Sequence, residues 1–178
     1  IDAAVYDVLE SGKYILGDQV SSFEKEFAEY LGSNYVIGCG SGTDALVLAL
    51  KALDIGSGNE VIVPSHTFIA SATCIDQVGA TPVFVDVEEE YHTLCPDSVE
   101  AAISSSTKAI IVVHLYGQPI NPRIFDIAKS KGIPIIEDSA QAHGAELNGR
   151  RIGSIGDLAT FSFFPSKNMA VGGDGGAL

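Results

Sequence analysis

From Asn34 onward, short apolar segments alternate with amphipathic segments of helical periodicity. The expected strands are 35–39, 60–64, 81–87, 108–116, 133–138 and 158–164, and the expected helices are 43–53, 68–78, 96–103 and 121–132. Segments 109–115 and 133–136 are apolar at almost every position, which is typical of parallel strands covered by helices on both faces. The pattern predicts an α/β fold of three layers, with a mostly parallel sheet in the middle.

The first 33 residues precede this alternation and have a different pattern. We expect a short helix that ends near Gly12, an extended segment at 13–20 and a second helix at 21–32. Ser21 or Ser22 is expected to cap the second helix, and Gly32 to end it. The sequence therefore predicts an N-terminal helical arm at 1–33 and a large domain at 34–178.

Charge and cysteine content narrow the possible partners. The 10 Lys and Arg residues against 23 Asp and Glu residues give a net charge of −13, which should repel nucleic acid and anionic membranes. No apolar run approaches the roughly 20 residues of a membrane-spanning helix, and the N-terminus does not resemble a signal peptide. Cys39, Cys74 and Cys95 form no metal-ligand pattern. We expect a cytoplasmic protein with free thiols, no metal, no nucleic acid and no membrane partner.

Ligands of open α/β sheets bind outside the carboxyl ends of the strands, so the residues after each strand are the candidates for a site. After strand 35–39, Gly38, Gly40 and Gly42 allow a tight turn, and Thr43 is expected to open a helix whose N–H groups favour an anion. The turn is equally consistent with a phosphate cup and with a plain connection. It matches neither the GxxxxGK[ST] nor the GxGxxG spacing.

Two aromatic side chains follow strand 60–64. Phe68 is expected in the first turn of the next helix, where it can stack on a flat ring or belong to the core. His66 is most simply a hydrogen-bonded loop residue.

The segment after strand 133–138 contains several polar residues, among them Glu137, Asp138, Gln141 and His143. A carboxylate at a buried strand end is costly unless it is paired. Asp138 can meet that need by pairing with a protonated ring nitrogen, or it can simply cap the next turn. His143 is a candidate acid, base or ligand, although no metal-ligand spacing surrounds it.

The last candidate is Lys167, which follows strand 158–164 and a Pro break. It is flanked by apolar residues and glycines, and a partly desolvated lysine can act as a nucleophilic amine. An ordinary loop lysine with its amine in solvent is the alternative.

Together, seven segments resemble the DegT-type sugar aminotransferases, a branch of the fold type I enzymes that use pyridoxal 5'-phosphate (PLP). They are YILGDQVSSFEKEFAEYLG, GSGTDALVLALKAL, GNEVIVPSHTFIAS, GATPVFVDV, TKAIIVVHLYGQP, IEDSAQAHGA and FSFFPSKNMAVGGDGGAL. They occur in the family's order over nearly the whole chain. The resemblance implies that 34–178 is a truncated form of the large PLP-binding domain, with the small C-terminal domain absent.

The resemblance also implies a role for each matching residue. Lys167 matches the lysine that carries PLP as a Schiff base, and Asp138 matches the partner of the pyridinium nitrogen. Gln141 matches the residue near the ring's 3-oxygen, and Phe68 matches the aromatic stacked on the ring. The matches to phosphate donors are Gly42, Thr43 and Ser162.

The activity implied is transfer of an amino group from an amino acid, commonly glutamate, to a keto sugar. The resemblance also implies that this sugar is linked to a nucleotide and that the enzyme is a homodimer. The related sugar dehydratases have His at the position of Lys167, so dehydration is the less favoured alternative. A non-catalytic PLP-binding regulatory module is the other alternative, and the fragment alone is expected to be inactive.

Overall fold

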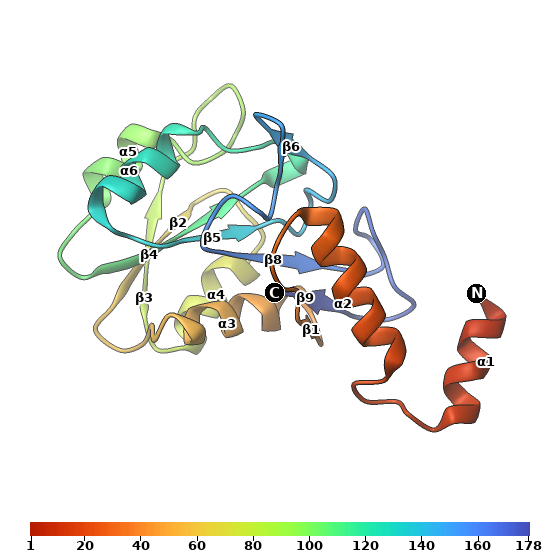
Figure 1. Ribbon diagram of the computed structural model, residues 1–178. Coiled ribbons are helices and arrows are strands. Elements are labelled where there is room, and N and C mark those ends of the chain that lie inside the picture. The colour runs from red at the N-terminus through yellow and green to blue at the C-terminus, as the bar shows by residue number, and fades with distance from the viewer.

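The computed structural model describes all residues from Ile1 to Leu178 (Figure 1). The helices are α1 (Asp2–Ser11), α2 (Asp18–Leu31), α3 (Gly42–Ala52), α4 (Ala70–Gln77), α5 (Pro96–Ala102) and α6 (Arg123–Lys131), with a short 3₁₀ helix, η1 (Leu115–Gly117). The strands are β1 (Gly38–Cys39), β2 (Glu60–Pro64), β3 (Thr81–Val85), β4 (Thr107–Val113), β5 (Ile135–Asp138), β6 (Glu146–Leu147), β7 (Arg150–Arg151), β8 (Leu158–Ser162) and β9 (Gly176–Ala177).

A seven-stranded sheet in the order β1-β9-β8-β5-β4-β2-β3 forms the middle of the molecule, and β6 pairs with β7 in a separate hairpin. The β3–β2, β2–β4, β4–β5 and β5–β8 pairs are parallel. The predicted α/β fold with a mostly parallel sheet is therefore confirmed. In this register Val113 lies beside Asp138, so the carboxyl ends of β4 and β5 lie at the same edge of the sheet.

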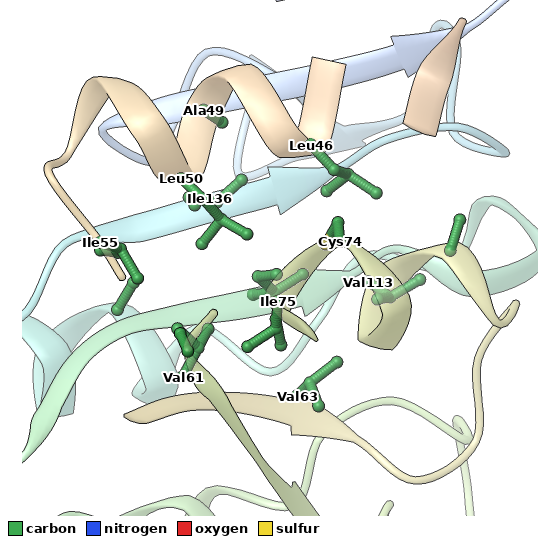
Figure 2. Close-up of a cluster of buried hydrophobic side chains, with 14 of the residues drawn as sticks. Leu46, Ala49, Leu50, Ile55, Val61, Val63, Cys74, Ile75, Val113 and Ile136 are labelled. Carbon is green, nitrogen blue, oxygen red and sulfur yellow. The ribbon is translucent and has the colours of Figure 1, made fainter. Parts of the chain in front are cut away.

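Both faces of the parallel strands are buried, as the apolar runs predicted. Because successive side chains of a strand point to opposite faces, Val61, Val63 and Ile111 pack in one cluster with α3 and α4. Figure 2 shows Leu46 and Leu50 of α3 in this cluster. The alternate residues of the same strands pack in a second cluster with α5 and α6 (Ile62, Ile110, Val112, Ile124, Ile127).

The end of the sheet formed by β1, β9 and β8 differs from the expected parallel pattern. The strand predicted at 35–39 is reduced to Gly38–Cys39, and β1 pairs antiparallel with β9, which in turn pairs antiparallel with β8. Close backbone packing explains Gly176, because a Cβ at this position would collide with the Ser41 carbonyl oxygen. A third apolar cluster covers this end, where Phe27 of α2 packs edge-on against Phe161.

The N-terminal helices end where the glycines predicted, because Gly12 and Gly32 both adopt the left-handed conformation after their helices. The predicted serine cap is wrong: α2 begins at Asp18, so Ser21 and Ser22 lie inside it, and its N-terminus has no side-chain cap. α1 buries no side chain, and it stands apart from the sheet in Figure 1. No helix is both long enough and apolar enough to cross a membrane.

A buried carboxylate anchors the loop between β7 and β8 beneath the sheet edge. Glu137 is fully buried, and its Oε2 accepts from Nε2 of His114 at 3.0 Å and from the Gly153 N–H. Its Oε1 accepts from the N–H groups of Ile155 and Gly156. On the other side of the ring, Nδ1 of His114 accepts from the Ile120 N–H at 3.3 Å. Four donors on one carboxylate fix this loop to β5.

These contacts set the ionisation of Glu137. Burial raises the pKa of the Glu137 carboxyl. The hydrogen bond and the charge of His114, together with the hydrogen bonds from the Gly156 and Gly153 N–H groups, outweigh that rise, so the pKa lies below its usual value. A folded-state pKa below the unfolded one means that the stabilisation is fully present above the unfolded pKa and is lost as the pH falls through the folded pKa.

We predict that Glu137→Gln lowers the free energy of unfolding at neutral pH by about 3 kcal/mol, because an amide nitrogen then faces buried N–H donors. Urea titration of the chain at neutral pH and again in acid measures the effect. The variant should also lose less stability than the wild type on acidification. Glu146→Gln, an exposed carboxylate of β6, is the control and should change stability by less than about 0.5 kcal/mol. Equal effects of the two substitutions would contradict this account.

Candidate active site

A cavity of about 340 Å³ opens at the carboxyl ends of the central strands. Its size is within the range of small-molecule sites. It is lined by every site residue that the sequence singled out for a cofactor, namely Gly42, Thr43, Phe68, Asp138, Gln141, Ser162 and Lys167. These residues come from four separate parts of the chain, near the starts of α3 and α4 and after β5 and β8. Their shared location is established by the structure, and their individual roles remain predictions.

One end of the cavity has the chemistry of an anion site. Helix α3 begins at Gly42, one residue before the predicted start, and the Ser41 side chain caps it by accepting from the Asp44 N–H at 3.0 Å. The N–H groups of Gly42 and Thr43 have no acceptor within the chain. A Cβ on Gly42 would lie 2.6 Å from Cβ of Ser162, so only glycine allows the helix end to approach β8 this closely. Free donors at a helix N-terminus favour an anion.

The carboxylate of Asp138 lies on the cavity wall at the end of β5 and is 6% exposed. Its Oδ2 accepts from the Ser71 hydroxyl at 2.8 Å, and its Oδ1 accepts from the Ala140 N–H at 3.2 Å. The turn-capping alternative is thus realised together with the cavity location. Burial raises the pKa of Asp138 above its usual value, while the hydrogen bonds from Ser71 and Ala140 and the charge of Lys167 oppose that rise.

The amide of Gln141 has a defined orientation in the cavity wall. Its Oε1 accepts from the Tyr116 N–H at 2.8 Å, so the NH₂ group of the amide is left as the free donor. Tyr116 supplies this N–H from a left-handed backbone conformation, with φ of 58°, which is uncommon for a residue other than glycine. The loop after β4 therefore holds Gln141 ready to donate to an oxygen.

Lys167 and Phe68 face each other across the cavity. Nζ of Lys167 lies 5.8 Å from the centre of the Phe68 ring. Lys167 is half-buried, and its side chain makes no hydrogen bond or ion pair. The expected position of Phe68 in the first turn of a helix is wrong, because α4 begins only at Ala70. Phe68 is 64% exposed, which excludes its alternative assignment to the core.

The two histidines considered from the sequence lie outside this cavity. His66 is exposed, and its Nε2 is 3.2 Å from the Tyr116 hydroxyl, as expected of a hydrogen-bonded loop residue. The ring of His143 packs against Phe161 and Phe163, with centroids 5.3 Å and 5.6 Å away. Burial, followed by the charge of Lys167, lowers the pKa of His143, which favours the neutral ring.

Sequence reasoning missed the residues that hold the cavity wall in place. Ser71 and Tyr116 contact Asp138 and Gln141 directly, and neither was singled out. A serine among apolar residues of a helix is a weak signal for Ser71. Nothing in the sequence indicates that the Tyr116 backbone N–H, rather than its ring, makes the contact.

The sequence of the chain matches a known family and several of its members. The family model described as the DegT/DnrJ/EryC1/StrS aminotransferase family matches residues 1–178. UDP-N-acetyl-3-dehydro-alpha-D-glucosamine 3-aminotransferase of Acidithiobacillus ferrooxidans is 53% identical, over 95% of this chain and 46% of that protein. The chain thus spans about half the length of the curated relatives that it matches.

Solved structures agree with the sequence matches. The crystal structure of DesV from S. venezuelae, in complex with a ketimine intermediate, is 51% identical with a TM-score of 0.96, and the match covers 99% of this chain and 48% of DesV. NtdA from Bacillus subtilis with bound cofactor PMP is 37% identical with a TM-score of 0.91, over 97% of this chain and 39% of NtdA. On the full-length family match, the fold and these likenesses, the chain belongs to the DegT/DnrJ/EryC1/StrS aminotransferase family.

Proposed function

We propose that the cavity binds PLP and that the whole protein is a PLP-dependent aminotransferase. The observation that carries the proposal is the combination, in one cavity, of an anion site, a buried carboxylate, an oriented amide donor, an amine and an exposed aromatic ring. These five features fit the phosphate, the ring nitrogen, the 3-oxygen, the aldehyde and the flat ring of PLP. The NtdA structure with bound PMP, the aminated form of PLP, supports the choice of cofactor.

Each residue has a distinct task in this proposal. The N–H groups of Gly42 and Thr43 and the Ser162 hydroxyl bind the phosphate. Phe68 packs on the face of the ring, and the NH₂ group of Gln141 donates to the 3-oxygen.

The carboxylate of Asp138 stays ionised and accepts a hydrogen bond from the protonated ring nitrogen. Because Asp138 is buried, a cationic neighbour stabilises its charged form more than it would stabilise an exposed carboxylate.

The reaction that we propose moves an amino group from an amino acid, with glutamate as the expected donor, to a keto sugar linked to a nucleotide. PLP, when bound, supplies an electron sink for the donor's Cα. Lys167 holds the cofactor through its amine and then moves the proton from the donor's Cα. The names of the relatives, which include UDP-sugar and dTDP-sugar aminotransferases, support the substrate class.

The residue at position 167 also separates this proposal from dehydration. The related dehydratases have His there, and His does not hold PLP through an amine. An amine that can both hold the cofactor and carry a proton also disfavours a binding-only regulatory protein.

We further propose a cytoplasmic homodimer. The three cysteines are free thiols, which supports a reducing compartment. Helix α1 and the segment after it leave Tyr6, Leu9, Tyr14, Ile15 and Leu16 exposed, and this apolar surface supports contact with a second subunit.

We predict that glutamate converts the PLP of the whole protein to PMP, with one 2-oxoglutarate released per site. Lys167→Ala should slow this conversion by at least about 10³-fold, because it removes the group that moves the proton. Absorbance of the bound cofactor and mass spectrometry of the products measure both. Lys131→Ala, at the exposed end of α6, is the matched control and should retain the wild-type rate. Bound PLP that glutamate leaves unchanged would favour a binding-only protein instead.

We predict that Gly42→Ala weakens PLP binding by about tenfold, because its Cβ would collide with Ser162 and push the helix end away from the phosphate. Equilibrium titration of the whole protein with PLP measures the change. Gly56→Ala is the control, because its Cβ would make an ordinary contact of 3.5 Å far from the cavity. Unchanged affinity in Gly42→Ala would exclude α3 as the phosphate site.

A further inference from the structure

A chain of two hydroxyl groups connects the cavity wall with the buried face of Asp138. Oγ1 of Thr67 lies 2.9 Å from Oγ of Ser71, and Oγ of Ser71 lies 2.8 Å from Oδ2 of Asp138. Thr67 lines the cavity, whereas Ser71 is fully buried in the first turn of α4. Neither hydroxyl makes any other hydrogen bond within the chain. The two hydroxyls therefore hydrogen-bond only to each other and to Asp138.

The donor and acceptor roles of the Thr67 and Ser71 hydroxyls depend on whether Asp138 is ionised. An ionised carboxylate only accepts hydrogen bonds, so Ser71 must donate to Asp138. The single proton of Ser71 is then used, and Thr67 must donate to Ser71. If Asp138 were protonated, its own O–H could donate to Ser71, and Ser71 could then donate to Thr67, so both hydrogen bonds would reverse. The observed pair of contacts thus links the state of Asp138 with the hydroxyl that faces the cavity.

We propose that Thr67 and Ser71 are positioning residues, which form a directed relay of hydrogen bonds that keeps Asp138 ionised and fixed toward the cavity. Its use for the ring nitrogen of PLP rests on the function proposed above. Hydrogen bonds in a chain polarise one another, so the outer hydroxyl strengthens the inner contact. The relay offsets part of the cost of burying this carboxylate.

Other charged and titratable groups around Asp138 cannot replace the relay. His114, which follows β4, directs its Nε2 to Glu137 rather than to Asp138. Cys74, on α4, has its pKa raised to about 12 by burial and by the charge of Asp138, so it stays a neutral thiol. Glu137, the adjacent carboxylate, carries a like charge and is held by its own four donors. The charges of Lys167 and then His114 lower the pKa of Asp138, but neither side chain hydrogen-bonds to it.

The test measures the pKa of Asp138 itself, by ¹³C NMR titration of the side-chain carboxyl groups in the whole protein without cofactor, with Asp138→Asn to assign the signal. Ser71→Ala should raise the pKa by about one unit, because it removes a hydrogen bond to the charged form. Thr67→Val should raise it by a smaller amount, and Thr67→Ser should restore the wild-type value. Thr73→Val is the control. Thr73 lies on the same helix and makes no side-chain hydrogen bond, so its substitution should leave the pKa of Asp138 unchanged.

A second measurement connects the relay with the cofactor. Ser71→Ala should weaken PLP binding by the whole protein by about tenfold, in line with the shift of one pKa unit. Wild-type pKa values in both Ser71→Ala and Thr67→Val would overturn the relay, and a shifted pKa with unchanged PLP affinity would overturn its proposed use. If Ser71→Ala does not fold, the Thr67→Val and Thr67→Ser pair decides by the same two readouts. Failure of the wild type to bind PLP would refute the proposed function alone, because the NMR titration needs no cofactor.

Discussion

The structure depends most on two adjacent carboxylates that are buried at the carboxyl end of β5. Glu137 and Asp138 point to opposite sides of one strand, and burial of either would be costly without partners. Glu137 is compensated by His114 and three backbone N–H groups, which fixes the loop that leads into β8. Asp138 is compensated only in part, by Ser71 and one N–H group, and it borders the cavity. Glu137 thus stabilises the fold, whereas Asp138 remains available to bind a ligand.

The parallel register of the strands brings other site residues next to Asp138. Val113 lies beside Asp138, so the loop after β4 reaches the cavity and its backbone orients Gln141. On the other side of β5, β8 lies parallel to it, and antiparallel β9 follows in the sheet. The close approach of Gly176 to Ser41 and of Gly42 to Ser162 then places the N-terminus of α3 at the same edge. Backbone packing thus brings the N-terminus of α3 to the cavity that Asp138 and Lys167 line.

The sequence predicted the features that depend on periodicity and on short motifs. The apolar runs of β4 and β5 predicted a sheet buried on both faces. The residues predicted to bind a cofactor, including Asp138 and Lys167, line one cavity, whereas His66 and His143 lie outside it. Features that depend on tertiary contacts could not be predicted. The pairing of β1 with β9 joins residues far apart in the chain, and the Tyr116 contact uses a backbone N–H in an unusual conformation. The start of α2 was misjudged because Gly17 offers no side-chain cap to recognise.

The central claim is that the amine of Lys167 holds PLP in this cavity. The most direct measurement is borohydride reduction of the whole protein after incubation with PLP, followed by peptide mapping by mass spectrometry. The account predicts one PLP per chain, attached to the peptide that contains Lys167, and no attachment in Lys167→Ala. Attachment at a different lysine, or no attachment in the whole protein, would contradict it.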